Sequence, residues 1–406
     1  MQAWGMEASV RETGGPPAVV ARVGSDPGKK TVLIYGHYDV QPPEPLEEWT
    51  TPPFEPRIAD GKVYARGSAD NKGQVLAHLL GTALELEERG ELPVNVIYVV
   101  EGEEEVGSPR LEEFLTAHRE EFACDVVAIS DTGMVASGYP TLTYGLRGIA
   151  ALELVVRGPS HDLHSGNFGG AVMNPATAVA RLLASLHDAD GRVAVEGFYD
   201  AIPPMEAWER EALAALPAGD AEIREMTGAP ALFGEAGYSG MERIGARPTA
   251  EVNGMGGGYQ GEGTKTVLPK SAFAKLTFRL VPHQDPQVIL NLVETHLKKH
   301  LAPGVTLELT RGHSAAATVC DPKSGFGRAA TRALELTFGK PPALVREGGS
   351  IPIVESFARI LGAETLLLGL ANPDCRAHSP NENFDLANLE SGIRLHRALL
   401  QELARA

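Results

Sequence analysis

The sequence predicts an α/β body, in which helices cover both faces of a mixed, mainly parallel sheet, and an α+β insert with an antiparallel sheet. Short apolar runs alternate with helical patterns in the first third of the chain, at residues 31–35, 94–100 and 125–130. Runs that are apolar almost throughout are typical of parallel strands buried on both faces. After about residue 147, apolar and polar residues alternate instead, as they do in half-exposed antiparallel strands.

Two helices are expected between the first strands. Residues 71–90 place an apolar stripe on one helical face, and Gly90 ends the pattern. The next helix is expected to begin with Ser108 as its N-cap and Pro109 at its first position. Strands and helices that alternate in this way form parallel sheets, because each crossover returns the chain to the same edge.

The insert is expected to span residues 147–315. It contains two strand patterns and two helical patterns, at residues 149–158, 271–282, 174–188 and 286–301. The α/β pattern then returns, with a helix at 325–339 and an apolar strand at 364–371. The sequence therefore predicts a discontinuous domain, residues 1–146 and 316–406, interrupted by a second domain.

Composition excludes several classes of function. The chain has 406 residues and a formal net charge of −17, which argues against nucleic acid or an anionic membrane as a partner. Its three cysteines lie far apart, without a Cys-x-x-Cys pair, which disfavours a disulfide framework and a thiolate zinc site. The first residues lack a secretory signal pattern, and no apolar run approaches membrane-spanning length. We therefore expect a soluble protein of the cytoplasm.

Polar side chains follow each predicted parallel strand at the point where it ends. They are His37 and Asp39 after the first strand, Glu101, Glu103, Glu104 and Glu105 after the second, Asp131 after the third, and Asp374, His378 and Glu382 after the fourth. Asp70 directly precedes a predicted helix. Because ligands bind beyond the carboxyl ends of the strands in open α/β sheets, these side chains are expected to meet in one crevice.

Each of these groups has an ordinary explanation when it is taken alone. The acidic run could be a solvated turn, Asp70 an N-cap, and His378 a loop histidine. Together, so many carboxylates would repel one another at neutral pH, and bound cations are the simplest remedy. Imidazole and carboxylate ligands suit zinc, with manganese or cobalt as alternatives, and the set exceeds one tetrahedral site. We therefore predict two divalent metal ions per chain.

Several longer motifs make the sequence similar to a known family. They include "GHYDVQPPEP", "YARGSADNKGQ", "EGEEEVGS", "LHSGNFGG", "FRLVPHQDP", "REGGSIP" and "AHSPNEN", and the similarity extends from about residue 30 to the end. The chain resembles the metallopeptidases that include aminoacylases, carboxypeptidase G and the carnosinase-like cytosolic dipeptidases. "GHYDVQP" and "LHSGNFGG" resemble the dipeptidase branch most.

The resemblance implies a role for each residue at the strand ends. His37 and Asp131 would bind one metal, Glu105 and His378 the other, and Asp70 would bridge the two. Asp39 would orient the ring of His37. Glu104 would be the general base, since the family pattern places the base and the ligand just before the residue that precedes Gly-Ser.

The resemblance also implies residues that bind the substrate. Arg279 would hold a substrate carboxylate, for which a guanidinium is suited, and Gly349 and Ser350 would donate hydrogen bonds near it. His164 would be the lid histidine that reaches the active site of a neighbouring subunit. A solvated arginine, a tight turn and an ordinary loop histidine are the plain structural alternatives.

The sequence thus predicts a zinc-dependent hydrolase that cleaves the amide bond of small peptides with a free carboxyl end. Glu104 would transfer the proton of the attacking water to the leaving amine. The insert would serve as a lid and form a homodimer. A deacylase of N-acyl amino acids is the first alternative, because its metal centre would look the same. A binding protein that keeps the fold without catalysis is the second.

Overall fold

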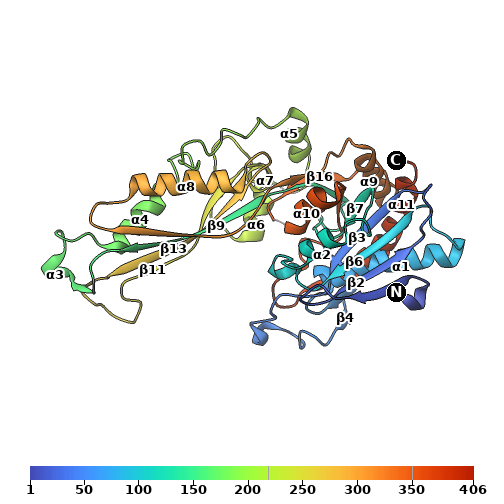
Figure 1. Ribbon diagram of the computed structural model, residues 1–406, viewed down its shortest axis with the longest axis horizontal. Coiled ribbons are helices and arrows are strands. Elements are labelled where there is room, and N and C mark those ends of the chain that lie inside the picture. The colour runs from blue at the N-terminus through green and yellow to red at the C-terminus, as the bar shows by residue number, and fades with distance from the viewer. Residues whose placement is uncertain (218, 350) are drawn as a thin grey trace.

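The structure of the protein is a computed structural model that describes residues 1–217, 219–349 and 351–406. Figure 1 shows two bodies that together make an elongated molecule. The rounded body contains both termini and the largest sheet, and the insert extends away from it as an arm. None of the helices described is both long and apolar enough to cross a membrane.

The rounded body is built on a mixed sheet of nine strands among the described residues. In spatial order the strands are β1 (Glu7–Arg11), β2 (Ala18–Val23), β6 (Asn95–Glu101), β3 (Thr31–His37), β7 (Val126–Ile129), β17 (Glu364–Gly369), β8 (Thr141–Leu146) and β15 (Thr318–Val319), with β16 (Ala343–Glu347) also paired to β8. The pairs β6–β3, β3–β7 and β7–β17 are parallel, and the pairs β1–β2 and β8–β15 at the edges are antiparallel.

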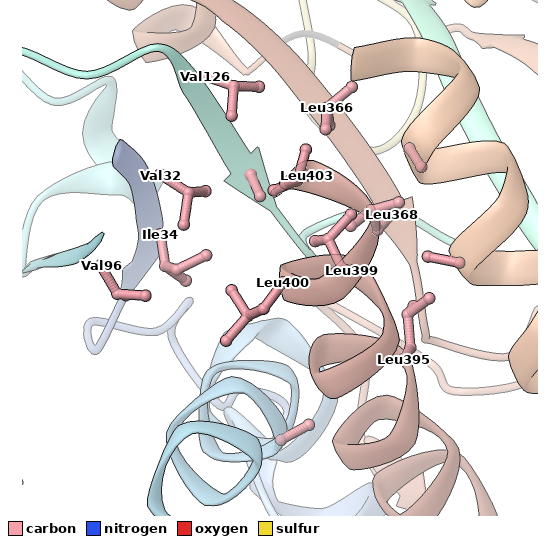
Figure 2. Close-up of a cluster of buried hydrophobic side chains, with 14 of the residues drawn as sticks. Val32, Ile34, Val96, Val126, Leu366, Leu368, Leu395, Leu399, Leu400 and Leu403 are labelled. Carbon is pink, nitrogen blue, oxygen red and sulfur yellow. The ribbon is translucent and has the colours of Figure 1, made fainter. Parts of the chain in front are cut away.

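Helices cover both faces of this sheet, as the near-continuous apolar strands require. Successive residues of β3 point to opposite faces, so Val32 and Ile34 belong to one core while Leu33 and Tyr35 belong to the other. The first core is closed by the helices α1 (Gly73–Arg89), α9 (Gly325–Phe338) and α11 (Leu386–Leu403) (Figure 2). The second is closed by α2 (Leu111–Ala117) and α10 (Pro352–Leu361).

The insert carries the antiparallel sheet. Its strands are β11 (Thr249–Gly257), β13 (Ser271–Leu280), β9 (Gly148–Arg157) and β14 (Thr306–Ala315), in that spatial order. The helices α4 (Pro175–Ala184) and α8 (Pro286–His300) cover one face, against alternate buried residues such as Leu276 and Phe278. Arg279 therefore belongs to the opposite, uncovered face, as its strand pattern predicts.

Smaller elements complete the fold. They are β4 (Arg57–Ala59), β5 (Lys62–Tyr64) and β18 (Asn383–Asp385) in a three-stranded sheet, β10 (Leu163–His164) paired with β12 (Val267–Leu268), and the short helices α3 (Ser165–Phe168), α5 (Ala207–Ala214), α6 (Asp220–Thr227) and α7 (Gly240–Ala246). Both α5 and α7 contact β16, so they lie where the insert meets the rounded body.

The predicted fold class is confirmed, and so are the parallel strands of the first third. One local prediction is wrong: α2 begins at Leu111, and Ser108 does not cap it. The Ser108 hydroxyl instead donates to Oε1 of Glu101 at 2.6 Å, and Tyr35 donates to the same oxygen at 2.7 Å. A buried carboxylate needs such hydrogen-bond donors, so the contact of Ser108 with Glu101 outweighs the preference of a serine for the N-cap of a helix. The bounds 147 and 315 stay our proposal for the limits of the insert.

A pair of buried histidines joins α1 to α11 beneath the sheet. His78 and His396 face each other with their Nδ1 atoms 2.9 Å apart, and their Nε2 atoms contact Ser130 Oγ and Thr82 Oγ1. Burial lowers the pKa of His78 to about 4. Burial, together with the charge of His78, also lowers the pKa of His396. Both rings are therefore neutral in the folded protein at neutral pH.

We predict that these two rings make the rounded body sensitive to acid. Each ring has a lower pKa in the folded protein than in the unfolded protein, so its contribution to stability is fully present above about pH 6.5. As the pH falls from there toward the folded pKa, the free energy of unfolding decreases by about 1.4 kcal/mol per pH unit for each ring. The urea midpoint of the wild type should fall between pH 7 and 5 more steeply than that of a His78→Gln/His396→Gln variant. The exposed His161→Gln is the control and should keep the wild-type slope; equal slopes in all three proteins would contradict the prediction.

Candidate metal centre

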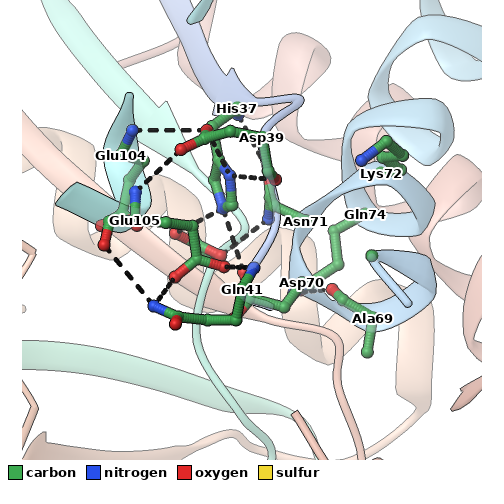
Figure 3. A network of polar contacts seen from close by, with 12 residues as sticks. His37, Asp39, Gln41, Ala69, Asp70, Asn71, Lys72, Gln74, Glu104 and Glu105 are labelled. Carbon is green, nitrogen blue, oxygen red and sulfur yellow. Dashed lines mark hydrogen bonds and ion pairs between the residues drawn. The ribbon is translucent and has the colours of Figure 1, made fainter. Parts of the chain in front are cut away.

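Most of the polar residues at the strand ends meet at one edge of the large sheet, as the topology predicts. The exceptions include Glu101, which is buried against Tyr35 and Ser108, and Asp374, which is exposed and pairs with Lys62. His37 is the last residue of β3, and Asp131 follows β7. Glu104 and Glu105 begin a short 3-10 turn after β6, and Asp70 lies in the turn that leads into α1 (Figure 3). His378 comes from the loop between β17 and β18. Five separate segments of the rounded body thus supply one cluster.

Asp70 belongs to two groups of metal-ligand atoms at once. One group contains His37, Asp70 and Asp131, the other Asp70, Glu105 and His378, with all ligand atoms of a group within 4.8 Å of one another. Oδ1 of Asp70 is 3.0 Å from Nε2 of His37, and Oδ2 is 2.9 Å from Nε2 of His378. Each oxygen of this carboxylate therefore faces a different group, which is the arrangement of a bridging ligand.

The charges in the cluster fit divalent cations. Burial raises the pKa of Asp131. Burial opposes ionisation of Asp70 too, but the hydrogen bonds of His37 and His378 lower its pKa below the usual value. Hydrogen bonds with Asp70 and Glu105 raise the pKa of His378 to about 10. Protonated imidazoles thus balance the carboxylates here, and two divalent cations held by the same nitrogen and oxygen atoms would balance them equally well.

Asp39 explains why a histidine and an aspartate lie two residues apart at the end of β3. Its Oδ1 is 3.2 Å from Nδ1 of His37, which leaves Nε2 of that ring to face Asp70 and Asp131. The two carboxylate oxygens also accept the backbone N–H groups of Glu104 and Glu105, at 3.3 and 3.0 Å. One side chain therefore orients an imidazole and fixes the turn that carries both glutamates.

Glu104 is suited to exchange a proton. Its side chain lines the cleft beside Asp131, and burial, followed by the negative charge of Asp131, raises its pKa to about 8. Among the described residues no donor lies within hydrogen-bonding distance of this carboxylate, so it is available to a water molecule or a substrate. A carboxylate that is both available and more basic than usual has the properties of a general base.

A cleft of about 780 Å³ opens beside the cluster, and both bodies line it. The rounded body contributes Asp70, Glu104, Glu105, Asp131, Glu347, Gly349 and His378, and the insert contributes Arg279, His313 and Ser314. The structure thus brings Arg279 and Gly349 to the predicted site. Ser350 lies outside the described residues. His164 ends β10, directly before α3, which Figure 1 shows at the far end of the insert.

Sequence reasoning missed several residues that contact the cluster. The amide of Gln41 donates to Oε2 of Glu105 at 2.8 Å (Figure 3), and that of Asn71 donates to Oδ1 of Asp131 at 2.9 Å. Glu347 and His313 line the cleft. Burial raises the pKa of Glu347 to about 7. Gln41 and Asn71 lie within "GHYDVQP" and "SADNKG", next to predicted site residues. A side-chain amide, however, is not by itself an indication of a metal site in a sequence.

We predict that Asp70→Asn weakens binding at both metal positions, whereas His378→Asn weakens only one. The reason is that Asp70 faces both groups and His378 faces one. Zinc titrations of the metal-free proteins should show two affinities reduced about tenfold or more in the first variant and one in the second. Asp374→Asn is the control, because this exposed residue of the same loop pairs with Lys62. Loss of a single affinity in Asp70→Asn would show that Asp70 is not shared.

Comparison with known proteins agrees with this geometry. The sequence model of the peptidase family M20/M25/M40 matches residues 33–402. The Cys-Gly metallodipeptidase DUG1 of Saccharomyces cerevisiae is 35% identical over 393 residues, which cover 95% of this chain and 82% of the relative. The Beta-Ala-His dipeptidase of Homo sapiens is 33% identical over 398 residues, or 96% of this chain and 78% of the relative.

Solved structures show the same likeness over the whole chain. The M20 family metallo-carboxypeptidase Sso-CP2 from Sulfolobus solfataricus has a TM-score of 0.89 and 33% identity, covering 99% of this chain and 91% of that one. Human carnosine dipeptidase 1 has a TM-score of 0.84 and 31% identity, covering 100% of this chain and 88% of that one. From the matched family model and the relatives of more than 30% identity, the protein is a metallopeptidase that belongs to the family M20/M25/M40.

Proposed function

We propose that this protein is a two-metal dipeptidase, which hydrolyses the amide bond of dipeptides or other small peptides with a free carboxyl end. The observation that carries the proposal is the position of Asp70, with one oxygen toward each ligand group at the floor of a cleft. The likeness to a Cys-Gly metallodipeptidase and a Beta-Ala-His dipeptidase supports it. Membership of a metallopeptidase family argues against a binding protein without catalysis.

Five residues would hold the two ions. They are His37, Asp131 and the shared Asp70 for one ion, and Glu105, His378 and the same Asp70 for the other. Bound divalent ions would lower the pKa of a water molecule and polarise the substrate carbonyl. Zinc suits this mixture of imidazole and carboxylate best, and manganese or cobalt would also be accepted.

The side chains of the cleft would perform the proton transfers. Glu104 accepts a proton from the attacking water and delivers it to the nitrogen of the leaving amine as the amide bond breaks. Its raised pKa favours both steps, because such a carboxyl group releases the proton readily and takes it up readily near neutral pH. Asp39 keeps Glu104 in place through the backbone of its turn.

The ends of the substrate would be held by groups of opposite charge. Arg279 projects from the uncovered face of β13 into the cleft and would bind the free carboxylate, with the backbone of Gly349 nearby. Glu347 lines the same cleft, and a carboxyl group there suits the ammonium group of a dipeptide. An N-acyl amino acid has no ammonium group, so Glu347 favours dipeptides over the substrates of a deacylase.

We predict that Glu104→Gln lowers kcat for a dipeptide by about 10²-fold or more while two metal ions still bind. Glutamine keeps the shape of the side chain but cannot accept the proton. The measurement is steady-state hydrolysis together with the metal content of the same protein. Glu103→Gln, one residue earlier in the same turn, is the control and should keep wild-type activity. Unchanged turnover in Glu104→Gln would remove this residue as the base.

The same assay tests the class of substrate. A panel of dipeptides and N-acetyl amino acids, with zinc or manganese added, should show cleavage of the dipeptides, and Glu347→Gln should raise KM for the dipeptides alone. Release of acetate without dipeptide cleavage would move the protein to the deacylases. Metal binding without any turnover would leave only the binding-protein alternative.

We further propose that the insert forms a homodimer in which His164 acts in the cleft of the partner subunit. The support is its place: His164 is exposed at the end of the insert that lies far from its own cleft. The three described cysteines are free thiols, which suits the reducing cytoplasm we propose as its location.

We predict that two inactive variants restore activity when their subunits are mixed. A dimer of His164→Asn with Glu104→Gln would contain one cleft that receives an intact His164 and also has Glu104. After unfolding and refolding together, the mixture should recover up to about one quarter of wild-type activity, since half of the dimers are mixed and each has one working site. A mixture as inactive as its parents would show that His164 does not act in the partner's cleft.

A further inference from the structure

A carboxylate outside both ligand groups is as deeply buried as the most buried residue in them. Glu382 is 0% exposed and lies four residues after His378. Its Oε1 accepts the backbone N–H groups of Ala69 and Asp70 at 2.9 and 3.0 Å. Its Oε2 accepts the backbone N–H of Gly67 at 2.9 Å and Nη1 of Arg66 at 2.8 Å. These four donors occupy the four lone-pair positions of an ionised carboxylate.

The segment that Glu382 holds is a short π-helical turn, Ser68–Lys72, whose geometry is interrupted at Asp70. Gly67 has a φ of 84°, and a Cβ there would lie 2.6 Å from Cγ1 of Val40. Asp70 itself departs from helical geometry, with φ −118° and ψ 92°. Three of the four donors to Glu382 are backbone groups of this short turn. The position of the Asp70 backbone therefore depends on the carboxylate below it.

Glu382 also belongs to the loop that supplies His378. The next residue, Asn383, closes this loop, because its side-chain amide donates to the carbonyl oxygens of Asp374, Cys375 and Asn381. The backbone carbonyl of Glu382 accepts the N–H of Ala65 at 3.1 Å, just before the turn that carries Asp70. One residue thus connects the turn of the shared ligand to the loop of a second ligand.

We propose that Glu382 is a positioning residue of the two-metal centre: it holds Asp70 where both ligand groups can share it and keeps the His378 loop against it. The inference rests on the proposed function, for which these residues bind metal. Glutamine at this position would keep the shape but turn one acceptor into an N–H₂ group that faces N–H donors. The Asp70 turn would then move, and both metal positions would be affected together because Asp70 is common to them.

A purely structural role would give a different result, and the chain contains a matched control. Glu235 and Arg247 form another buried ion pair, in the insert, with hydrogen bonds of 2.7 and 2.8 Å. Their side chains are 6% and 8% exposed, against 1% and 1% for Glu382 and Arg66. Glu235→Gln therefore removes a similar buried charge without any contact to the ligand turns, so it reports the cost in stability alone.

The test is a zinc titration of the metal-free wild type, Glu382→Gln and Glu235→Gln, read by competition with a chromogenic chelator while circular dichroism verifies folding. Glu382→Gln should weaken both zinc affinities by about 10- to 100-fold, whereas Glu235→Gln should keep them within about twofold. Wild-type affinities in Glu382→Gln, or equal losses in both variants, would overturn the proposal.

A second variant covers the case in which Glu382→Gln does not fold. Glu382→Asp keeps a carboxylate for Arg66 but is one methylene shorter, so it cannot also reach the N–H groups of Ala69 and Asp70. Weakened zinc binding in this variant supports positioning, and unchanged binding overturns it. Because zinc binding is measured without peptide, a wild type that binds two ions and cleaves no dipeptide would refute the proposed function and leave this test intact.

Discussion

The carboxylate of Asp70 stands between two imidazole rings, and the rest of the centre depends on how its charge is balanced. Glu104, Glu105 and Asp131 line the same cleft, so four acidic groups share a small, partly buried volume. Without positive charges between them these carboxylates would move apart, because like charges at short range in a low-dielectric site repel strongly. Their proximity is stable only with cations among them. The arrangement therefore favours bound divalent cations, which would take the place of the protons on the two imidazoles.

A rigid support is needed to hold charges against their repulsion, and the buried sheet provides it. β3, β6 and β7 are packed on both faces, which fixes the points where His37, the glutamate turn and Asp131 leave the sheet. Residues without metal-ligand roles then set the finer geometry. Asp39, Asn71 and Glu382 each join two segments that are distant in sequence, mostly through backbone N–H groups or carbonyls, which do not depend on the side chain at the partner position.

The parts of this design that could be predicted from the sequence are those that follow from periodicity and topology. Buried parallel strands appear in a sequence as apolar runs, and their carboxyl ends must lie at one edge of the sheet, so the sequence alone places His37, Asp131 and His378 together. The choice of Glu104 and Glu105 over Glu103 required the family resemblance, since three consecutive glutamates look alike. The prediction for Ser108 is wrong because a local sequence pattern does not show that the buried Glu101 needs the Ser108 hydroxyl as a hydrogen-bond donor. Glu382 was visible as a polar residue at a strand end, but its four donors come from residues 66–70, and no spacing rule connects segments more than 300 positions apart.

The cleft has a further property that follows from its two walls. The rounded body supplies the residues proposed as metal ligands and base, whereas the insert supplies Arg279, His313 and Ser314. The two sets of groups therefore reside on different hydrophobic cores, and substitutions in one wall need not disturb the packing of the other. Relatives of this chain carry names as different as Cys-Gly metallodipeptidase and Beta-Ala-His dipeptidase at nearly the same identity to it. Two walls with separate cores would allow the recognition surface to change while the charge cluster is kept, which is a physical route to that diversity. For this chain, the choice among peptides is accordingly to be sought around Arg279 of the insert, not at the metal ligands.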